Sequence, residues 1–151
     1  MRRTLVLTAV VAALVWGALV THAASKKEVT DFHVIVNSSN PVEKLTLTQV
    51  SRLFLKKDTE WADGTPVEPV DMAPDVQLRK EFSKTFHNRS LSSVKSYWQQ
   101  AIFSGTAVPP PELESEEKVM QFVASHPGAI GYLPSSTGVG GPIKAVEITE
   151  G

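Results

Sequence analysis

The sequence contains no cysteine, and this absence removes several kinds of chemistry at once. Disulfides, thiol catalysis, cysteine-ligated zinc, iron–sulfur clusters and a lipidated N-terminal cysteine are all excluded. An excess of charge of one sign is also lacking, because 15 basic residues face 16 acidic ones and leave a formal net charge of -1. We therefore expect no nucleic-acid partner that depends on a broad basic surface.

The motifs of common catalytic and cofactor sites are absent too. The sequence has no glycine-rich phosphate loop with Lys-Ser/Thr, no GxGxxG after a strand, no GxSxG and no HExxH. Beyond the first segment the histidines are His33, His87 and His126, and their spacing does not suggest a metal site. We therefore expect no catalytic residue, no metal and no cofactor, and a protein that is not an enzyme.

The first 23 residues have the pattern of a secretory signal peptide. Arg2 and Arg3 precede an apolar run over 5–20, and Thr21-His22-Ala23 places small residues on either side of the histidine. The alternative is a retained membrane anchor, for which the run is shorter than the about 20 residues of a span. We expect cleavage after Ala23, a flexible leader over 24–31, no later membrane span, and a location in a bacterial periplasm.

The remaining chain alternates short apolar runs with amphipathic segments, which predicts one α/β domain over 32–151. We expect a central sheet of about four strands, flanked by helices, with the last strand at an edge. The expected strands are 32–36, 67–70, 129–133 and 143–148.

Polar residues indicate where the helices begin. Thr46 and Gln49 form a capping box, Ser92 and Ser115 are expected caps, and Pro74-Asp75 opens a further helix. Four acidic residues at the start of the last helix are expected to form a solvated patch; they are Glu112, Glu114, Glu116 and Glu117.

Asp71, Asp75 and Arg79 flank a strand-to-helix turn and allow two interpretations. They are either a polar ligand cluster at a helix N-terminus or a helix cap with an Asp–Arg pair at the surface. Two acids at this position weaken the case for an anion, so the cap and surface pair are favoured. Trp61 lies in a loop and is a candidate for a surface contact, whereas Tyr97 and Trp98 lie on an apolar helical stripe and are expected in the core.

A series of short motifs follows in a fixed order along the chain. It runs from VIVNSSNPV and a helix ending in RLFLKK through Trp61-x-x-Gly64, VEPVD, Arg79-x-x-Phe82, Tyr97-Trp98, Phe103-x-Gly105 and Pro109-Pro110 to PGAIGY at 127–132. By these motifs the stretch from Phe32 to Pro134 resembles the periplasmic phosphate-binding-protein family of ABC transporters, a branch of the type II solute-binding proteins.

The resemblance implies one lobe of a type II periplasmic-binding-protein fold and non-catalytic binding of phosphate or another small polar solute for a transporter. A complete family member has two lobes, so a single lobe would need a second copy or a protein partner to enclose a solute. The candidate ligand-binding residues are Ser38, Ser39, Asp71, Gln77 and Arg79.

The family's phosphate ligands are not present at the matching turn. In the family an arginine and a Ser-Gly-Thr follow the strand that corresponds to 67–70. Here Asp71 takes the basic position, and Val76, Gln77 and Leu78 take the hydroxyl and glycine positions. The alternative function is therefore an interaction or scaffold module of an envelope complex that has lost the phosphate site. Its expected signature is an exposed apolar patch, with Trp61, Pro109 and Pro110 as partner contacts.

Overall fold

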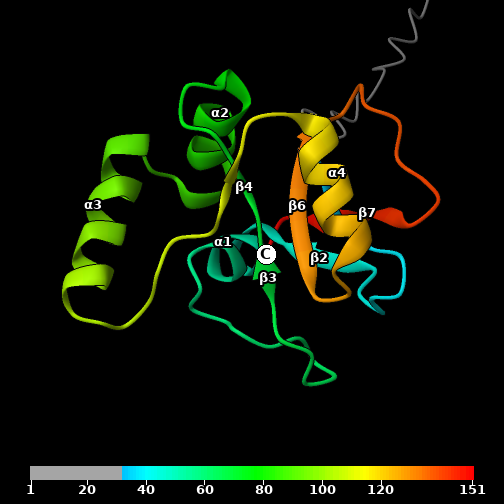
Figure 1. The fold of residues 1–151 in the computed structure, drawn as a ribbon, viewed down its shortest axis with the longest axis horizontal. Coiled ribbons are helices and arrows are strands. Elements are labelled where there is room, and N and C mark those ends of the chain that lie inside the picture. Colours follow the sequence, from blue (N-terminus) through cyan, green and yellow to red (C-terminus); the bar gives the residue numbers. More distant parts are fainter. Residues whose placement is uncertain (1–31) are drawn as a thin grey trace, which may run out of the picture.

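The computed structural model describes residues 32–151, so the expected signal peptide 1–23 and leader 24–31 lie outside the described residues. A five-stranded mixed sheet forms the centre of the fold (Figure 1). Its strands, in spatial order, are β2 (Lys44–Thr46), β7 (Ile143–Thr149), β1 (Phe32–Asn37), β6 (Ala129–Pro134) and β3 (Glu68–Pro69). β1 is antiparallel to both β6 and β7, whereas β2 and β3 are each parallel to their neighbours.

The α/β class and the four expected strand regions are confirmed, but the sheet has a fifth strand and a different edge. β2 was not expected because it has three residues, of which only Leu45 is buried, and it pairs with the distant β7. β7 therefore lies between β1 and β2 and is not an edge strand. A separate pair of short parallel strands joins β4 (Asp71–Met72) to β5 (Glu112–Leu113).

Residues 32–151 form four helices: α1 (Leu47–Phe54), α2 (Gln77–His87), α3 (Leu91–Phe103) and α4 (Glu116–Ser125). The capping box at Thr46 and Gln49 and the cap at Ser115 are confirmed. The other two helix starts were predicted wrongly. Ser90, not Ser92, accepts the backbone N–H of Ser93 and caps α3. The prediction chose the wrong serine because several serines lie close together at this helix start. The α2 N-cap is Val76, which provides no side-chain bond, so Asp75 does not cap this helix.

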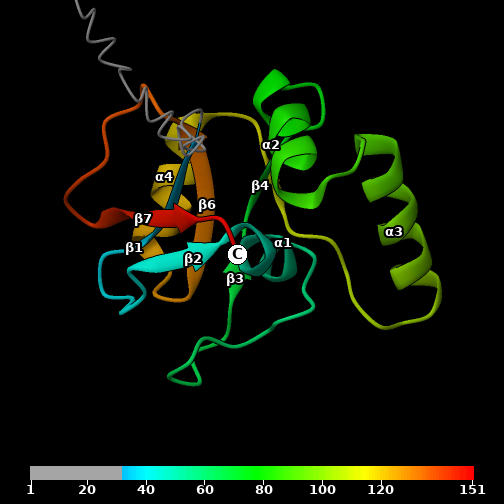
Figure 2. The same cartoon turned by 180° about the vertical axis from the view of Figure 1, so that it is seen from behind.

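The main core lies where β1 and β6 meet α1, α2 and α4. Aromatic rings fill its centre, and the rings of Phe82 and Tyr132 stack with 3.8 Å between their centroids. α3 stands to one side of this body, beyond α2 (Figures 1 and 2). It packs through a smaller cluster that consists of Leu55, Val94, Trp98 and Ala101. The expected core position of Trp98 is confirmed, and Tyr97 is half-buried beside it. Within residues 32–151 no helix is long and apolar enough to cross a membrane.

Candidate functional site

The turn between β4 and α2 holds an ion pair that is buried. The Nη1 atom of Arg79 lies 2.5 Å from Oδ1 of Asp71, and both side chains are almost fully covered, at 6% and 5% exposed. The Tyr132 hydroxyl donates to the same carboxylate oxygen at 2.5 Å, and the backbone N–H of Met72 donates to it at 3.0 Å. The expectation of a surface pair is therefore wrong, because the fold packs α2 against β4 and β6 and covers both charges.

The charged groups of this network, Asp71 and Arg79, interact mainly with each other. Burial raises the pKa of the Asp71 carboxyl above its usual range, while Arg79 and the Tyr132 hydroxyl act against that rise. Burial and the Asp71 charge also raise the pKa of Tyr132, so its hydroxyl remains a hydrogen-bond donor. The Oδ1 atom of Asp71 is therefore occupied from within the protein by Arg79, Tyr132 and Met72.

Arg79, in contrast, has donor capacity that the described residues do not use. Its Nη1 donates to the carbonyl of Met72 at 2.9 Å, and its Nη2 lies 3.8 Å from the half-exposed carboxylate of Glu112. Its Nε is buried and has no hydrogen-bond partner within residues 32–151. A guanidinium has five N–H donors, and an unused buried donor is uncommon in folded proteins.

An apolar groove of about 390 Å³ lies beside this guanidinium, between α3 and the segment that leads into β5. Its walls come from α3 on one side and from two prolines on the other: Leu91, Val94, Trp98 and Ile102 face Pro74 and Pro109. Arg79 and Glu112 supply charged groups to the same groove, and Lys95 adds a further one from α3. Apolar walls with a few convergent polar groups are the usual composition of a small-ligand site.

The structure brings some of the sequence candidates together and separates others. Arg79 and Pro109 both line the groove, with Asp71 bonded to Arg79. Pro110 is buried and is not an exposed contact. Gln77 is exposed, bonds to Glu81 and does not line the groove.

Ser38 and Ser39 lie at the opposite end of the sheet. Their turn follows Asn37 at the end of β1, and the side chain of Asn37 donates to the carbonyls of Val123 and Ala124 near the end of α4. Because β1 and β6 are antiparallel, this turn lies beside the start of β6, whereas Tyr132 lies in the second half of that strand and pairs with Val34. The two serines therefore do not form one site with Arg79.

Trp61 was predicted to be an exposed partner contact, and that prediction is wrong. Its indole is 8% exposed and donates its N–H to the carbonyl of Gly128 at 2.9 Å. The surrounding loop sequence, with a turn at Asp63-Gly64, indicated only that the backbone is at the surface. The sequence also gave no sign of Glu112 or Ile102 as groove residues, because their proximity to Arg79 depends on contacts between distant segments.

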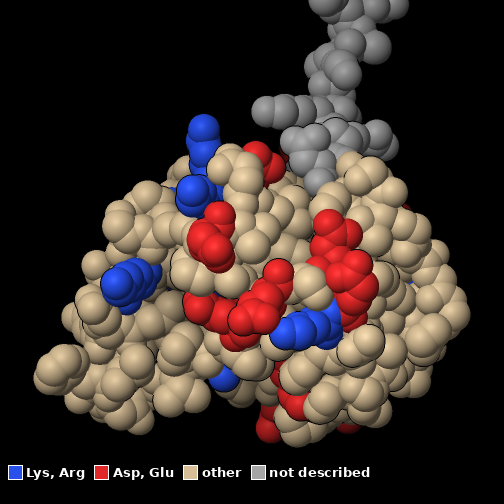
Figure 3. All heavy atoms as spheres, turned by 45° about the horizontal axis from the view of Figure 1, so that its top comes forward, with Lys and Arg blue, Asp and Glu red and all other residues tan. Residues whose placement is uncertain are grey.

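The end of the molecule where α4 begins is acidic. Glu112, Glu114 and Glu117 are exposed there, as the sequence predicted. Figure 3 looks onto this end and shows acidic side chains gathered in the middle of the face. Such an acidic surface repels a phosphate dianion. It does not resemble the basic and hydroxyl-bearing turn that binds phosphate in the phosphate-binding-protein family.

The fold is that of one lobe of a periplasmic binding protein, and it is similar to part of several solved phosphate-binding proteins. It superposes on a candidate phosphate ABC transporter substrate-binding protein from Clostridium perfringens, solved with bound phosphate, with a TM-score of 0.62, 20% identity and 78% of this chain covered. An ABC-type phosphate transport receptor from Vibrio cholerae gives 0.61 at 18% identity over 78% of this chain. A candidate phosphate binding protein from Planctomyces limnophilus gives 0.56 at 14% identity over 80%.

The matched region is less than half of each of these proteins, at 44%, 46% and 42% of their chains. The expectation of a single type II lobe is thereby confirmed at the level of the fold. No family model matches the sequence, and no curated protein matches it either.

Proposed function

We propose that this protein is an exported, non-catalytic binding protein that holds a small polar solute in the groove beside Arg79. The observation that carries the proposal is the guanidinium of Arg79, which lines an apolar groove and whose Nη2 forms no hydrogen bond within residues 32–151, with Glu112 3.8 Å away. Export is supported by the signal-like pattern of residues 1–23. The non-catalytic role is supported by the similarity of the fold to solved proteins that are described as binding proteins.

The groove favours a solute with an acceptor oxygen and an apolar part over phosphate. The charge of Arg79 is already balanced by Asp71, and Glu112 brings a second carboxylate to the guanidinium. A phosphate dianion would therefore meet no net positive charge at this place. A carbonyl or hydroxyl oxygen can accept from the unused donors without bringing another negative charge.

A thermal-shift titration tests this proposal on the purified protein. We would titrate N-acetyl-leucine amide, which combines carbonyl oxygens with an apolar side chain, and in parallel phosphate and sulfate. A ligand at about 100 times its Kd adds about 2.7 kcal/mol and raises Tm by several degrees. We expect a saturable rise with the amide and none with the anions.

Neighbouring residues on α3 provide a matched pair of variants. Ile102 lines the groove and is 53% exposed, whereas Phe103 is 95% exposed and lies outside it. Ile102→Glu should abolish the rise with the amide, and Phe103→Glu should keep it. A rise with phosphate that survives Ile102→Glu would refute the groove and restore a phosphate-transport role. If neither the amide nor the two anions raises Tm, the proposal that this protein binds a solute is refuted.

A second candidate function is an interaction module, which one observation favours. Three large apolar side chains, Ile102, Val108 and Phe103, are exposed at the end of α3 and in the loop after it. Exposed apolar side chains that lie together on a surface are typical of protein-interaction sites. Capture of a partner from envelope extract, or self-association in sedimentation velocity, that Phe103→Ser abolishes would support this function. Retention of both by the variant would exclude this surface.

A further inference from the structure

Three neighbouring surfaces form one row across the molecule: a basic patch, the groove beside Arg79 and an acidic patch. The basic patch lines a hollow at the end of α2 and the start of α3, and within residues 32–151 no carboxylate lines the same hollow. Its cations are Lys80, Lys84 and Arg89. The hollow shares Leu91 and Ser92 with the groove, so the basic patch adjoins the groove.

The acidic patch adjoins the groove from the direction of α4. Glu112 lines the groove itself, and the chain continues from it into the start of α4. The exposed carboxylates of this patch are Glu112, Glu114 and Glu117. Figure 3 shows both signs of charge on one face, with basic side chains at the upper left and acidic ones across the middle. The groove therefore lies between two patches of opposite charge.

Both ends of the row carry charge that can serve a partner. None of the three cations of the basic patch forms an ion pair within the described residues, and Glu117 forms none there either. The middle of the row is apolar, because the groove walls lie there and Ile102 is 53% exposed at the groove. An apolar centre between polar margins is the usual composition of a protein interface.

Two copies related by a twofold axis present the same surface to each other, so that surface must be complementary to itself. An axis that lies in the interface and crosses the row at the groove meets this condition, because it places the basic patch of each copy opposite the acidic patch of the other. We propose that this face binds a second copy of the chain in this way, with the two grooves facing each other. A small anion would engage the basic patch alone, whereas a second copy supplies a counter-charge to both patches. The inference does not depend on what the groove binds.

Charge reversal on each side of the row gives two variants that test the axis. Lys80→Glu with Lys84→Glu reverses the basic patch. Glu114→Lys with Glu117→Lys reverses the acidic patch. Each variant alone places like charges opposite each other, so its dimer Kd in sedimentation equilibrium of the full-length protein should rise by about tenfold or more. A mixture of the two variants restores opposite charges at both contacts and should form a dimer with the wild-type Kd.

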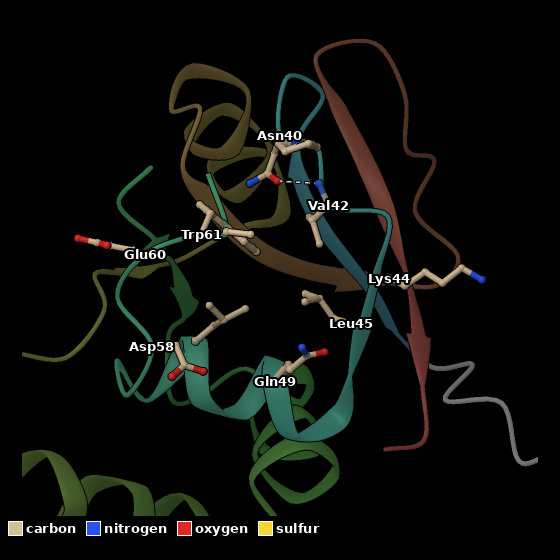
Figure 4. A pocket seen from close by; sticks show the side chains of 11 residues that line it. Asn40, Val42, Lys44, Leu45, Gln49, Asp58, Glu60 and Trp61 are labelled. Atoms are coloured by element: carbon tan, nitrogen blue, oxygen red, sulfur yellow. Dashed lines mark hydrogen bonds between the residues drawn. The ribbon is translucent and has the colours of Figure 1, made fainter. Parts of the chain in front are cut away.

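A matched control reverses two lysines outside the row, Lys44→Glu with Lys57→Glu. Both lysines are exposed, and neither lines the basic hollow, the groove or the pocket at the start of α4. Lys44 pairs with Glu147 at the β2 edge of the sheet, and its side chain points outward there (Figure 4). This control changes the net charge as much as reversal of the basic patch does, and it should keep the wild-type dimer.

Four outcomes would overturn the proposal. The wild type could remain monomeric at low salt up to about 1 mM. The mixture of the two variants could remain as dissociated as each variant alone. Association could be equal in all variants, or be lost in Phe103→Ser and kept in both charge reversals, which would assign it to another surface. Growth beyond a dimer would refute the twofold axis, because a closed twofold contact stops at two copies.

Discussion

Replacement of Arg79 by methionine should destabilise the protein by about 4 kcal/mol, because it leaves the Asp71 carboxylate buried without its cation. Removal of one partner from a buried pair costs about 3–5 kcal/mol. The two bonds that Asp71 keeps, from Tyr132 and from the backbone of Met72, do not neutralise its charge. Methionine fills most of the vacated volume, so a cavity adds little. In a domain of this size Tm should fall by about 15 °C.

Urea unfolding of a double-variant cycle measures the effect directly. Asp71→Asn combined with Arg79→Met removes both charges, so the double variant should lose only about 1–2 kcal/mol, which is much less than the sum of the losses of the two single variants. Glu112→Gln is the control. The exposed fraction of its side chain is 45% and it lies 3.8 Å from Nη2, so its loss should cost under about 0.5 kcal/mol.

The Arg79→Met loss should also depend on pH. Without the cation, the folded-state pKa of Asp71 rises further above its unfolded value, so the variant is penalised increasingly as pH rises between those two pKa values. The variant should therefore approach the wild type in acid. A loss below about 1 kcal/mol at pH 7, or additive effects of the two substitutions, would refute the buried ion pair.

Three further predictions concern other parts of the fold. Trp98→Ala should cost about 3–5 kcal/mol in urea unfolding if the small cluster beneath α3 is a true core, and a loss under about 1 kcal/mol would contradict that. Burial lowers the pKa of His87 to about 4 in the folded state. As pH falls from about 6.5 to 4 the unfolded state binds the proton first, so about 3 kcal/mol of stability should be lost; His87→Gln should flatten that profile, and an unchanged profile would exclude His87. Gly128→Ala would place a Cβ 2.0 Å from the Pro66 carbonyl oxygen, so thermal unfolding should show a loss of about 3 kcal/mol or more, and a neutral effect would rule out this close approach.

Local sequence patterns predicted the helices and strands of this fold more reliably than they predicted which strands pair in the sheet. The capping box at Thr46 could be predicted because both of its members lie within one helical turn. β2 could not, since three residues with one buried side chain carry no period, and their pairing with β7 is set by the rest of the sheet.

The candidate site follows the same division. Asp71 and Arg79 could be paired from the sequence, because they flank one turn. Their burial depends on Tyr132 and β6, which no local pattern indicates. Trp61 was misplaced for a related reason, because its loop is at the surface but its indole bonds to Gly128 in a distant segment.

The position of β1 in the sheet has a consequence for how the chain folds. β1 is the first strand of the described chain, and both of its neighbours, β6 and β7, are the last two. The central pairing therefore closes a loop that contains nearly the whole domain, and such nonlocal contacts slow folding. We expect helices α1 to α4 to form early without a sheet to pack against. The native state should be reached cooperatively and only after the C-terminal strands are free to pair. A chain truncated before β7 would then remain unfolded, with the apolar face of β1 exposed to aggregation or to chaperones.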